Sequence, residues 1–486
     1  MSVKPIATVR VKPAEHRAFA KLSGDRNPIH VDAAYARRSF AGEPIVHGAH
    51  LLLRAIDAHC RSARIAGPLS VTARFLKPAF PGEPIEIFRT AEDAAVRLTI
   101  SAGATLADVL IAPRPAGDAP TPPHGTDLTP ARASRPPREP AVRGVEDADR
   151  AKGVLEPADA AAASRAFPRA ARALGAEVVA AIARLSAVVG MECPGRDSLL
   201  SQMTLDVTPR APESPLDWRV TRTDRLLRLV RLAVRGAGVV GTVQAFVRRP
   251  PAPAPDVAAI ASIVTPGEFA GQTALIVGGS RGLGAATAAI VAAGGGAAIL
   301  TYHSSGEAAA SLKRAIVAAG FKADALRIDV VEHSGPLAKA AERFGVTHLY
   351  YFATPKIFAR RREPFDVALF HRFCEVYVDG FARACDAVAS AAPAASVFYP
   401  SSTAIAEFLP DLTEYSAAKA AGETLCDVLP RILSGLSIMR MRLPRITTDQ
   451  TASLIAAAAA DPVEVMLPIV RELHQSRAAM TEAGRA

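Results

Sequence analysis

The pattern of apolar and polar positions changes along the chain. Near the N-terminus, helical periods over residues 14–22 and 47–59 precede alternating runs that are typical of strands, at residues 69–76, 84–89, 95–101 and 108–112. A similar order returns later, with a helical period at residues 178–186 and strand-like runs at residues 199–207, 217–222, 226–234 and 239–247. We therefore expect a helix followed by a curled antiparallel sheet twice, which suggests duplication.

From about residue 266 onward, strand-like and helical segments alternate, which predicts a parallel sheet covered by helices. Thr273–Val277 is a short apolar run of the kind that forms a buried strand. The most apolar stretch, Ala285–Leu300, is interrupted by Gly294–Gly296. It predicts a helix, a turn and a buried strand rather than a membrane span.

Two Pro-rich segments separate these regions. Residues 113–140 contain many prolines and no apolar period, so we expect an extended, solvated linker, and residues 250–255 have the sequence PPAPAP. For a chain of 486 residues, three domains are within the usual range. The expected division is residues 1–112, a linker at 113–154, residues 155–249, a linker at 250–265, and residues 266–460.

The composition narrows the functional classes. The net charge is +10, but the arginines are scattered and aromatic residues make up only 5%, which argues against nucleic acid as a partner. A basic surface would suit phosphate-bearing substrates, although an Arg-rich proteome explains the charge equally well. Five dispersed cysteines without a CxxC pair, and an N-terminus without a signal peptide, indicate a reducing cytoplasm, with no zinc or other metal and no membrane partner.

A glycine-rich turn directly follows the first strand of the C-terminal region. Gly278, Gly282 and Gly284 stand at G-x-x-x-G-x-G spacing and open an Ala-rich helix. Such a turn lets the backbone approach a pyrophosphate and directs a helix N-terminus at its negative charge. The pattern predicts a nucleotide site, and the alternative is a Gly-rich turn in a generic α/β domain.

Two features favour NADP(H) over NAD as the nucleotide. Many NAD-specific enzymes carry an acidic residue at the end of the second strand, where it binds the ribose hydroxyls. Here Ala297–Thr301 is followed by Tyr302, His303 and Ser304, and no acidic residue is present. Arg281 lies in the glycine turn itself, where a cation can meet a 2′-phosphate.

A catalytic group follows at Ser402, Tyr415 and Lys419, in the spacing Ser-x12-Tyr-x3-Lys. Their separation places Tyr415 and Lys419 on one face of a helix. The lysine ammonium favours the phenolate, so Tyr415 can exchange a proton with a carbonyl or alcohol oxygen. The Ser402 hydroxyl can hydrogen-bond the same oxygen.

With the glycine turn and this group, residues 266–450 resemble the short-chain dehydrogenase/reductase family, especially its 3-oxoacyl reductases. The resemblance implies that Ser402 binds the substrate oxygen, that Tyr415 is the general acid/base, and that Lys419 binds the nicotinamide ribose and tunes Tyr415. Asp329 matches the family's adenine contact. The expected cofactor-binding residues are Gly278, Ser280, Arg281, Gly282, Leu283, Gly284, Asp329, Tyr415 and Lys419.

Three departures from the family pattern bear on the reductase chemistry. The Asn-Asn-Ala-Gly after the fourth strand is replaced by Tyr-Phe-Ala-Thr at residues 351–354, and the asparagine of the proton relay corresponds to Tyr377. The Pro-Gly after the sixth strand is Pro444-Arg445. The catalytic Ser, Tyr and Lys remain, so the alternatives are a reductase with an altered relay and a domain that binds NADP(H) without turnover.

The N-terminal region carries a second constellation, in the string SGDRNPIH at residues 23–30. Pro28 disfavours a helical conformation at Asn27, so the segment forms a shaped loop. Asp25 and His30 could converge on one water molecule and add it to, or remove it from, an activated double bond. Alternatively, Asp25 is a turn residue and His30 makes a structural hydrogen bond.

Together with IVHG at residues 45–48, this string resembles the MaoC-like, (R)-specific enoyl-CoA hydratases of the hotdog fold. The resemblance implies that Asp25 and His30 are the acid/base pair and that the backbone amide of Gly48 polarises the thioester carbonyl. Residues 155–249 resemble the second half of a double hotdog but lack the Asp-x-Asn-Pro-x-His string. We expect this half to be non-catalytic, and the alternative is that Glu192 is a separate acid.

The predicted fold is multidomain, α+β and α/β: a double hotdog followed by a Rossmann, doubly wound parallel sheet. The predicted function is bifunctional. NADPH reduces a 3-oxoacyl-CoA or carrier-protein thioester, and Asp25 with His30 interconverts the (R)-3-hydroxyacyl and trans-2-enoyl thioesters. The alternatives are an active hydratase fused to a reductase for a non-thioester carbonyl, or to a non-catalytic NADP(H)-binding domain. By analogy with both families, a homo-oligomer is expected.

Overall fold

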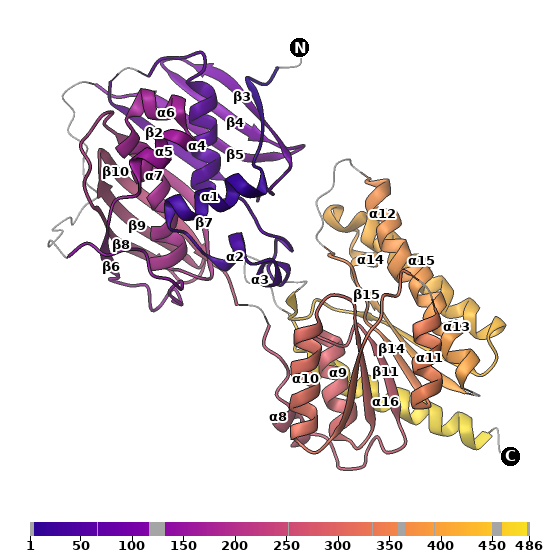
Figure 1. The fold of residues 1–486 in the computed structure, drawn as a ribbon. Helices are drawn as coiled ribbons and strands as arrows, with labels where there is room; N and C mark the ends of the chain where they lie inside the picture. Colours follow the sequence, from indigo (N-terminus) through magenta and orange to yellow (C-terminus); the bar gives the residue numbers. More distant parts are fainter. Residues whose placement is uncertain are drawn as a thin grey trace. The chain divides into compact units, whose positions relative to one another are not determined.

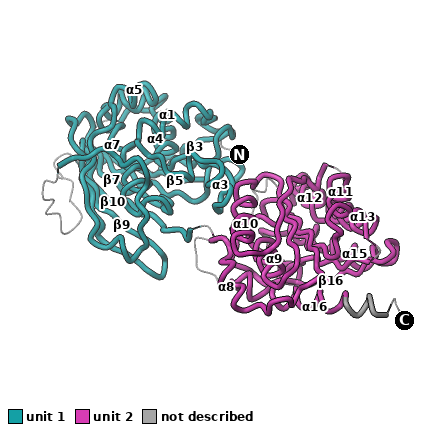
Figure 2. The backbone as a smooth tube through the Cα atoms, turned by 60° about the horizontal axis from the view of Figure 1, so that its bottom comes forward, with its two compact units in different colours: residues 1–250, 453–456 teal, residues 251–452, 457–486 magenta. Residues whose placement is uncertain are grey.

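The computed structural model describes residues 4–65, 67–115, 132–250, 252–332, 334–357, 365–392, 394–449 and 459–483. These residues form two compact units, one up to residue 250 and one from residue 252 onward (Figure 2).

The first unit is built on a ten-stranded antiparallel sheet with the order β1-β3-β4-β5-β2-β7-β10-β9-β8-β6. Its first half comprises β1 (Ala7–Arg10), β2 (Leu69–Phe75), β3 (Pro84–Glu92), β4 (Ala95–Ser101) and β5 (Thr105–Pro113). Its second half comprises β6 (Lys152–Leu155), β7 (Ser198–Val207), β8 (Leu216–Asp224), β9 (Leu229–Gly236) and β10 (Val239–Val247). Outward from the centre, the two halves have the same strand order, which confirms the predicted duplication.

The two halves join where β2 pairs with β7, in a register that matches Val71 with Leu205. Both of these side chains are fully buried, and they belong to one apolar core that extends through both halves. The long helices α4 (Gly48–His59) and α7 (Ala176–Ala187) lie along the same face of the sheet and contact each other (Figure 1). The unit is therefore a double hotdog with a shared core.

Shorter helices complete the first unit: α1 (Pro13–Ser23), α2 (Pro28–Val31), α3 (Ala33–Arg37), α5 (Ala160–Ala166), α6 (Pro168–Leu174) and a π-helical turn, η1 (Val188–Glu192). Within the described residues, no single helix is long and apolar enough to cross a membrane. Two consecutive helices, Pro168–Leu174 and Ala176–Glu192, meet the length and composition criteria only together, and they are bent by 115°.

The expected linker at 113–154 is only partly a linker. Residues 116–131 lie outside the described residues, but Val145 and Ala148 are buried in the hotdog core, and Lys152–Leu155 forms strand β6 against β8. The Pro-rich composition concealed these contacts, because each involves only a few apolar residues. The second hotdog therefore includes residues before 155.

The second unit has a six-stranded parallel sheet with the order β13-β12-β11-β14-β15-β16. Its strands are β11 (Thr273–Val277), β12 (Ala297–Tyr302), β13 (Lys322–Arg327), β14 (His348–Tyr351), β15 (Ala395–Ser402) and β16 (Leu436–Leu443). The strand order reverses between β11 and β14, which is the switch point where such sheets bind nucleotides. The Rossmann prediction is confirmed.

Helices cover both faces of this sheet (Figure 1). On β11, Ala274 and Ile276 face one core, and Leu275 and Val277 face the other. The helices and helical turns are α8 (Val257–Ala261), α9 (Gly282–Ala293), α10 (Gly306–Ala318), α11 (Gly335–Phe344), α12 (Val367–Cys374), η2 (Glu375–Gly380), α13 (Phe381–Ala391), α14 (Ala404–Glu407), η3 (Pro410–Leu412), α15 (Thr413–Ile432) and α16 (Pro462–Ala483).

The second unit extends beyond the expected limits of 266–460. Val257 and Ile260 of α8, in the expected linker at 250–265, are buried in the same core as Phe269. On the other side, Met466 and Val470 of α16 are buried in this core, and α16 packs on α9. Helix α8 has only five residues and follows a Pro-rich segment, so its apolar period was too short to predict it. Helix α16 lies beyond the expected limit of the domain, although it has buried residues at a helical period, Met466, Ile469, Val470 and Leu473.

Candidate active sites

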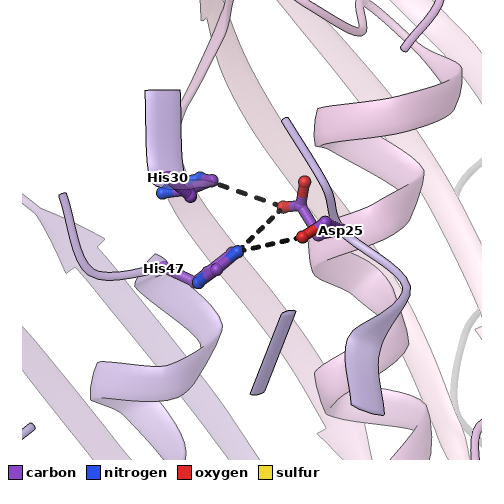
Figure 3. Close-up of side chains that lie close together, drawn as sticks. All are labelled: Asp25, His30 and His47. Atoms are coloured by element: carbon purple, nitrogen blue, oxygen red, sulfur yellow. Dashed lines mark hydrogen bonds and ion pairs between the residues drawn. The ribbon is translucent and has the colours of Figure 1, made fainter. Parts of the chain in front are cut away.

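The structure brings Asp25 and His30 together across a short loop. Helix α1 ends at Ser23, and the next residue, Gly24, has a left-handed φ of 77° that turns the chain. The side chain of Asn27 accepts a hydrogen bond from the amide of Ile29 and caps α2, which carries His30. His30 Nε2 lies 3.9 Å from Asp25 Oδ2 (Figure 3).

A backbone contact fixes the tautomer of His30. Its Nδ1 lies 2.7 Å from the carbonyl oxygen of Ile45, and because a carbonyl can only accept, Nδ1 carries the proton. In the neutral ring, Nε2 is therefore an unprotonated acceptor on the side of Asp25. Burial lowers the pKa of His30, against the opposing charge of Asp25, which favours this neutral form.

Asp25 is 1% exposed. Burial raises the pKa of its carboxyl group, and His30, Ser186 and Asn27 oppose the shift. Ser186 donates to Oδ2 over 2.7 Å, and the amide of Asn27 donates to Oδ1 over 3.0 Å. The result is a carboxylate with fixed orientation and raised proton affinity, as a general base requires.

His47, the N-cap of α4, completes this cluster. Its ring stacks on His30 with centroids 3.8 Å apart, and its Nε2 donates to the backbone oxygen of Asp25 over 3.2 Å. The sequence contained His47 in the IVHG string but did not single it out. By distance alone, Asp25, His30 and His47 could ligate one metal ion, since their ligand atoms lie within 4.8 Å of one another, although the sequence predicts no metal.

The second hotdog supplies much of the wall around Asp25. In addition to Ser186, helix α7 carries Arg184, which donates to the carbonyl of Ser23 over 2.7 Å. In η1, the carbonyl of Gly190 accepts from Asn27, and a Cβ at Gly190 would lie 2.4 Å from Asp25 Oδ1. Sequence reasoning missed Ser186 and Arg184, because only the glycines near them form a recognisable pattern.

Glu192, the alternative acid, lies at the end of η1. Burial raises its pKa, and Arg143 opposes the shift. Arg143 also donates to the backbone carbonyl of Glu192 over 3.3 Å. In the part of the chain that the structure describes, no recorded contact joins the Glu192 side chain to Asp25 or His30.

Gly48 is the first residue of α4, so its N–H has no acceptor within the helix. A Cβ there would lie 2.9 Å from a methyl of Leu200 and 3.2 Å from the ring of Phe75. The amide is thus flanked by apolar side chains from β7 and β2. This is a suitable setting for a hydrogen bond to an acyl carbonyl.

In the second unit, the glycine turn lies at the switch point of the sheet. Gly278 has a φ of 78°, and a Cβ there would lie 2.8 Å from the backbone of Phe352, the residue after β14. A Cβ at Gly284 would lie 2.4 Å from the carbonyl of Gly278. Ser280 lies in the turn, Leu283 in the first turn of α9, and α9 begins at Gly282. Only glycine fits at these contacts, and the turn directs a helix N-terminus outward, as a pyrophosphate requires.

The expected adenosine contacts already have protein partners. Arg281 forms an ion pair of 2.9 Å with Asp449. Asp329 lies two residues after β13, accepts from the amide of Val331, and has Oδ2 3.3 Å from His303 Nε2. His303 follows β12, and the sequence did not assign it a role.

Ser402 lies at the end of β15, and Tyr415 and Lys419 lie one turn apart on α15. Burial raises the pKa of Tyr415, and a hydrogen bond with Ser402 opposes the shift. Lys419 donates from Nζ to the carbonyl of Pro400 over 2.6 Å, and burial lowers its pKa to about 7. The three groups could bind and protonate a carbonyl oxygen.

Two of the three departures from the family pattern meet at the turn η2, where Tyr377 lies against Lys419. Tyr377, in the π-helical turn η2, lies edge-to-face with Tyr415, with ring centroids 5.6 Å apart. Its hydroxyl is hydrogen-bonded to Thr354. Tyr351 donates to the carbonyl of Val376 in the same turn over 2.6 Å. Aromatic side chains therefore occupy the region where the family pattern has asparagine.

Comparisons with known proteins agree with this division. Residues 1–105 match a family model described as a MaoC like domain, and residues 272–456 match one described as short chain dehydrogenase. A 3-hydroxyacyl-thioester dehydratase Y of Mycobacterium tuberculosis is 37% identical over 115 residues, which are 22% of this chain and 39% of that protein. An (R)-specific enoyl-CoA hydratase of Aeromonas caviae is 35% identical over 80 residues, which are 16% of this chain and 58% of that protein.

The chain thus matches less than two thirds of the length of these two relatives. Among solved structures, a short chain dehydrogenase from Burkholderia cenocepacia J2315 in complex with NADP is 24% identical. That alignment covers 42% of this chain and 90% of the other, with a TM-score of 0.38.

Proposed function

We propose that this chain, which joins an N-terminal MaoC-like domain to a C-terminal short-chain dehydrogenase domain, is a bifunctional enzyme of acyl thioesters. One site reduces a 3-oxoacyl thioester with NADPH, and the other interconverts the (R)-3-hydroxyacyl and trans-2-enoyl thioesters. The observation that carries the proposal is the buried Asp25 carboxylate facing the unprotonated Nε2 of His30. The 3-hydroxyacyl thioester is common to both reactions, which gives a reason for the fusion.

In the hydration direction, the thioester carbonyl accepts a hydrogen bond from the Gly48 amide, which draws electrons from the C2–C3 double bond. A water molecule held by the Asp25 carboxylate and His30 Nε2 loses one proton to this pair as its oxygen bonds to C3. The π-electron pair takes up a proton at C2, which the protonated member of the pair supplies. Dehydration follows the same steps in reverse.

In the reductase, bound NADPH supplies the hydride. Tyr415 donates the proton to the substrate oxygen, Ser402 hydrogen-bonds that oxygen, and the Lys419 ammonium favours the phenolate left behind. Arg281 and His303 are the nitrogen donors proposed for the 2′-phosphate. Because Arg281 is paired with Asp449, this carboxylate would have to release the guanidinium for Arg281 to hold a 2′-phosphate.

The substrate class follows from the site and from the names of the relatives, a thioester dehydratase and an enoyl-CoA hydratase. We propose CoA or carrier-protein thioesters as substrates, a cytoplasmic location and a homo-oligomeric state. A second candidate is an active hydratase fused to a domain that binds NADP(H) without turnover. Tyr377 at the family's asparagine position is the observation that favours it.

Two variants, each serving as the control for the other, test the proposal. With crotonyl-CoA, Asp25→Asn should lose hydration by about 100- to 10,000-fold, because the carboxylate is the group that accepts and returns a proton. Oxidation of NADPH with acetoacetyl-CoA should be unchanged in this variant. Tyr415→Phe should have the opposite effect. Survival of hydration in Asp25→Asn would exclude the acid/base pair, and NADPH oxidation that is equal in Tyr415→Phe and the unmodified protein would exclude Tyr415.

A further inference from the structure

The surroundings of the Lys419 ammonium are unusually aromatic. Lys419 is 6% exposed, and its Nζ lies 4.2 Å from the ring centroid of Tyr377 and 4.7 Å from that of Tyr399. Its one recorded hydrogen bond, within the described residues, is to the carbonyl of Pro400. Two ring faces therefore provide much of the environment of this cation.

Hydrogen bonds at the rims of both rings fix their faces in this position. The Thr354 hydroxyl donates to the carbonyl of Pro355, so it accepts from the Tyr377 hydroxyl. The Tyr399 hydroxyl donates over 3.3 Å to the carbonyl of Tyr377, which lies in the π-helical turn η2. With both hydroxyls engaged elsewhere, the electron-rich faces of the rings meet the ammonium.

Acidic groups near Lys419 stabilise its ammonium form only weakly. Glu423 and Cys426, both on α15, favour the ammonium form, but burial outweighs them and lowers the pKa of Lys419 to about 7. The Glu423 carboxylate is already bound by Ser401 over 2.5 Å and by Arg442 over 2.7 Å. Tyr415, one turn earlier on α15, is a buried phenol whose pKa is raised. The two rings are therefore an important source of stabilisation for the protonated form of Lys419.

We propose that Tyr377 and Tyr399 form an aromatic clamp that keeps Lys419 charged and fixed in position, with Tyr377 in the place where the family pattern has an asparagine. In this role Tyr377 is a positioning residue, and it acts through Lys419. The ring face is the functional part, and the hydroxyl only holds the ring in place. The inference rests on the proposed reductase function, because it assigns a role within that site.

Three variants separate the ring from its hydroxyl and from general packing. Tyr377→Phe keeps the face, Tyr377→Leu removes it, and Tyr350→Leu removes another buried ring that lies in a different core of the same unit. The readout is the pH dependence of kcat/KM for acetoacetyl-CoA reduction, which falls at high pH as Lys419 loses its proton. Tyr377→Leu should move this fall to lower pH by at least ~0.5 unit, and Tyr377→Phe and Tyr350→Leu should leave it in place.

A shift of equal size in Tyr350→Leu, or no shift in Tyr377→Leu, would overturn the clamp. If Tyr377→Leu does not fold, phenylalanines with increasing fluorine substitution at position 377 replace it, because they weaken the ring face with little change of shape. The fall should then move progressively to lower pH with each fluorine, and a constant profile would overturn the clamp.

A second readout does not depend on cofactor or activity. The pH dependence of acetylation of Lys419 by acetic anhydride, measured on its peptide by mass spectrometry, reports directly on the free amine. In Tyr377→Leu the free amine should appear at lower pH than in the unmodified protein and Tyr377→Phe, and coincident curves would overturn the clamp. Shifted labelling in a protein without reductase activity would support the clamp while the proposed reductase function failed.

Discussion

Asp25 and Lys419 are buried ionisable groups of the two candidate sites, but different chemistry surrounds each of them. The Asp25 carboxyl group is held by hydrogen-bond donors, the hydroxyl of Ser186 and the amide of Asn27. The Lys419 ammonium has one carbonyl acceptor and two ring faces. Hydrogen bonds fix the direction of the Asp25 carboxylate, which suits the placing of a water molecule. Ring faces hold a cation with less directional constraint.

A π-helical turn lies beside each group, and in each turn one residue determines how much space is left next to the group. In η1, Gly190 has no side chain, so the Asp25 carboxylate occupies the space where a Cβ would be. In η2, the buried ring of Tyr377 lies against the ammonium of Lys419. Such turns are frequent at functional sites because they displace a backbone carbonyl and redirect side chains. We therefore expect that a larger side chain in η1 would disturb the Asp25 carboxylate, and that a smaller, non-aromatic one in η2 would disturb the Lys419 ammonium.

Among the variants that compare the two turns and their surroundings, the largest effect is expected from Gly190→Ala. Its new methyl group would lie 2.4 Å from Asp25 Oδ1 and displace the carboxylate from His30. A misplacement of about 1 Å can cost ~100-fold in rate, so hydration of crotonyl-CoA should fall by at least this factor. NADPH oxidation should be unchanged. Val189→Ala, in the same turn, is the control, and equal losses in the two variants would show that the turn matters only for folding.

In the second unit, the equivalent test is Gly284→Ala, which also adds a methyl group to a closely packed glycine. A methyl group there would lie 2.4 Å from the carbonyl of Gly278 and distort the nucleotide turn. Binding of NADPH, measured by fluorescence, should be lost while hydration of crotonyl-CoA continues. If NADPH binding survives, the glycine turn is not the pyrophosphate site.

A smaller loss is expected from Ser186→Ala, which tests the contribution of the second hotdog. A hydrogen bond to a charged group is worth about 1.5–3 kcal/mol, so removing it should lower kcat for hydration by roughly 10- to 100-fold. KM should change less, because Ser186 orients Asp25 and is not assigned a substrate contact. Ser186→Thr, which keeps the hydroxyl, should recover part of the loss. Unchanged hydration in Ser186→Ala would show that Ser186 does not assist Asp25, in agreement with the structural role that the sequence predicts for the second hotdog.

The two candidate sites also show which functional residues can be predicted from the sequence. The glycine turn and the string at residues 23–30 each place their key residues within a short window, so spacing alone predicts them. Ser186 is 161 residues from Asp25, and the two meet only because the halves share one core. Nothing near Ser186 distinguishes it from other serines on a buried helix. A contact between duplicated halves therefore needs the structure.

The same limit applies to the second site. The sequence identified Tyr377 as a departure from the family pattern, but the direction of its ring depends on η2 and on Thr354. Strand β6 and helix α8 have only four and five residues, so they were missed because tertiary packing, rather than a long period, stabilises them. The roles assigned to Asp25, His30, Ser402, Tyr415 and Lys419 remain predictions that the variants above will test.

The pH profiles of the two activities should slope in opposite directions. Asp25 must be ionised to accept a proton, and its raised pKa means that hydration falls as the pH drops towards that value. Lys419 must be protonated, and with a pKa of about 7 it loses its charge as the pH rises through neutrality, so reduction falls. The measurement is kcat/KM for both reactions on one preparation, which reports on the free enzyme. Parallel profiles would contradict the comparison of the two buried groups.

The smallest expected effect concerns stability of the first unit in acid. Burial holds the pKa of His50 well below 6.5, so below that pH the unfolded chain binds a proton that the folded chain does not. Stability is therefore lost as the pH falls below 6.5, by up to about 1.4 kcal/mol per pH unit for one such group. His50→Leu should reduce the decrease in Tm between about pH 7 and pH 5.5 by roughly 2–4 °C.

Trp218, the only tryptophan in the chain, is buried in β8 of the first unit, so its fluorescence follows unfolding of that unit. The control is His303→Leu, whose side chain is 63% exposed and lies in the second unit. This variant should leave the dependence of the Trp218 transition on pH unchanged. If His50→Leu leaves the dependence unchanged as well, the His50 imidazole is not the group that takes up the proton on unfolding. Another buried histidine beside Asp25, such as His47, would then be the next to replace.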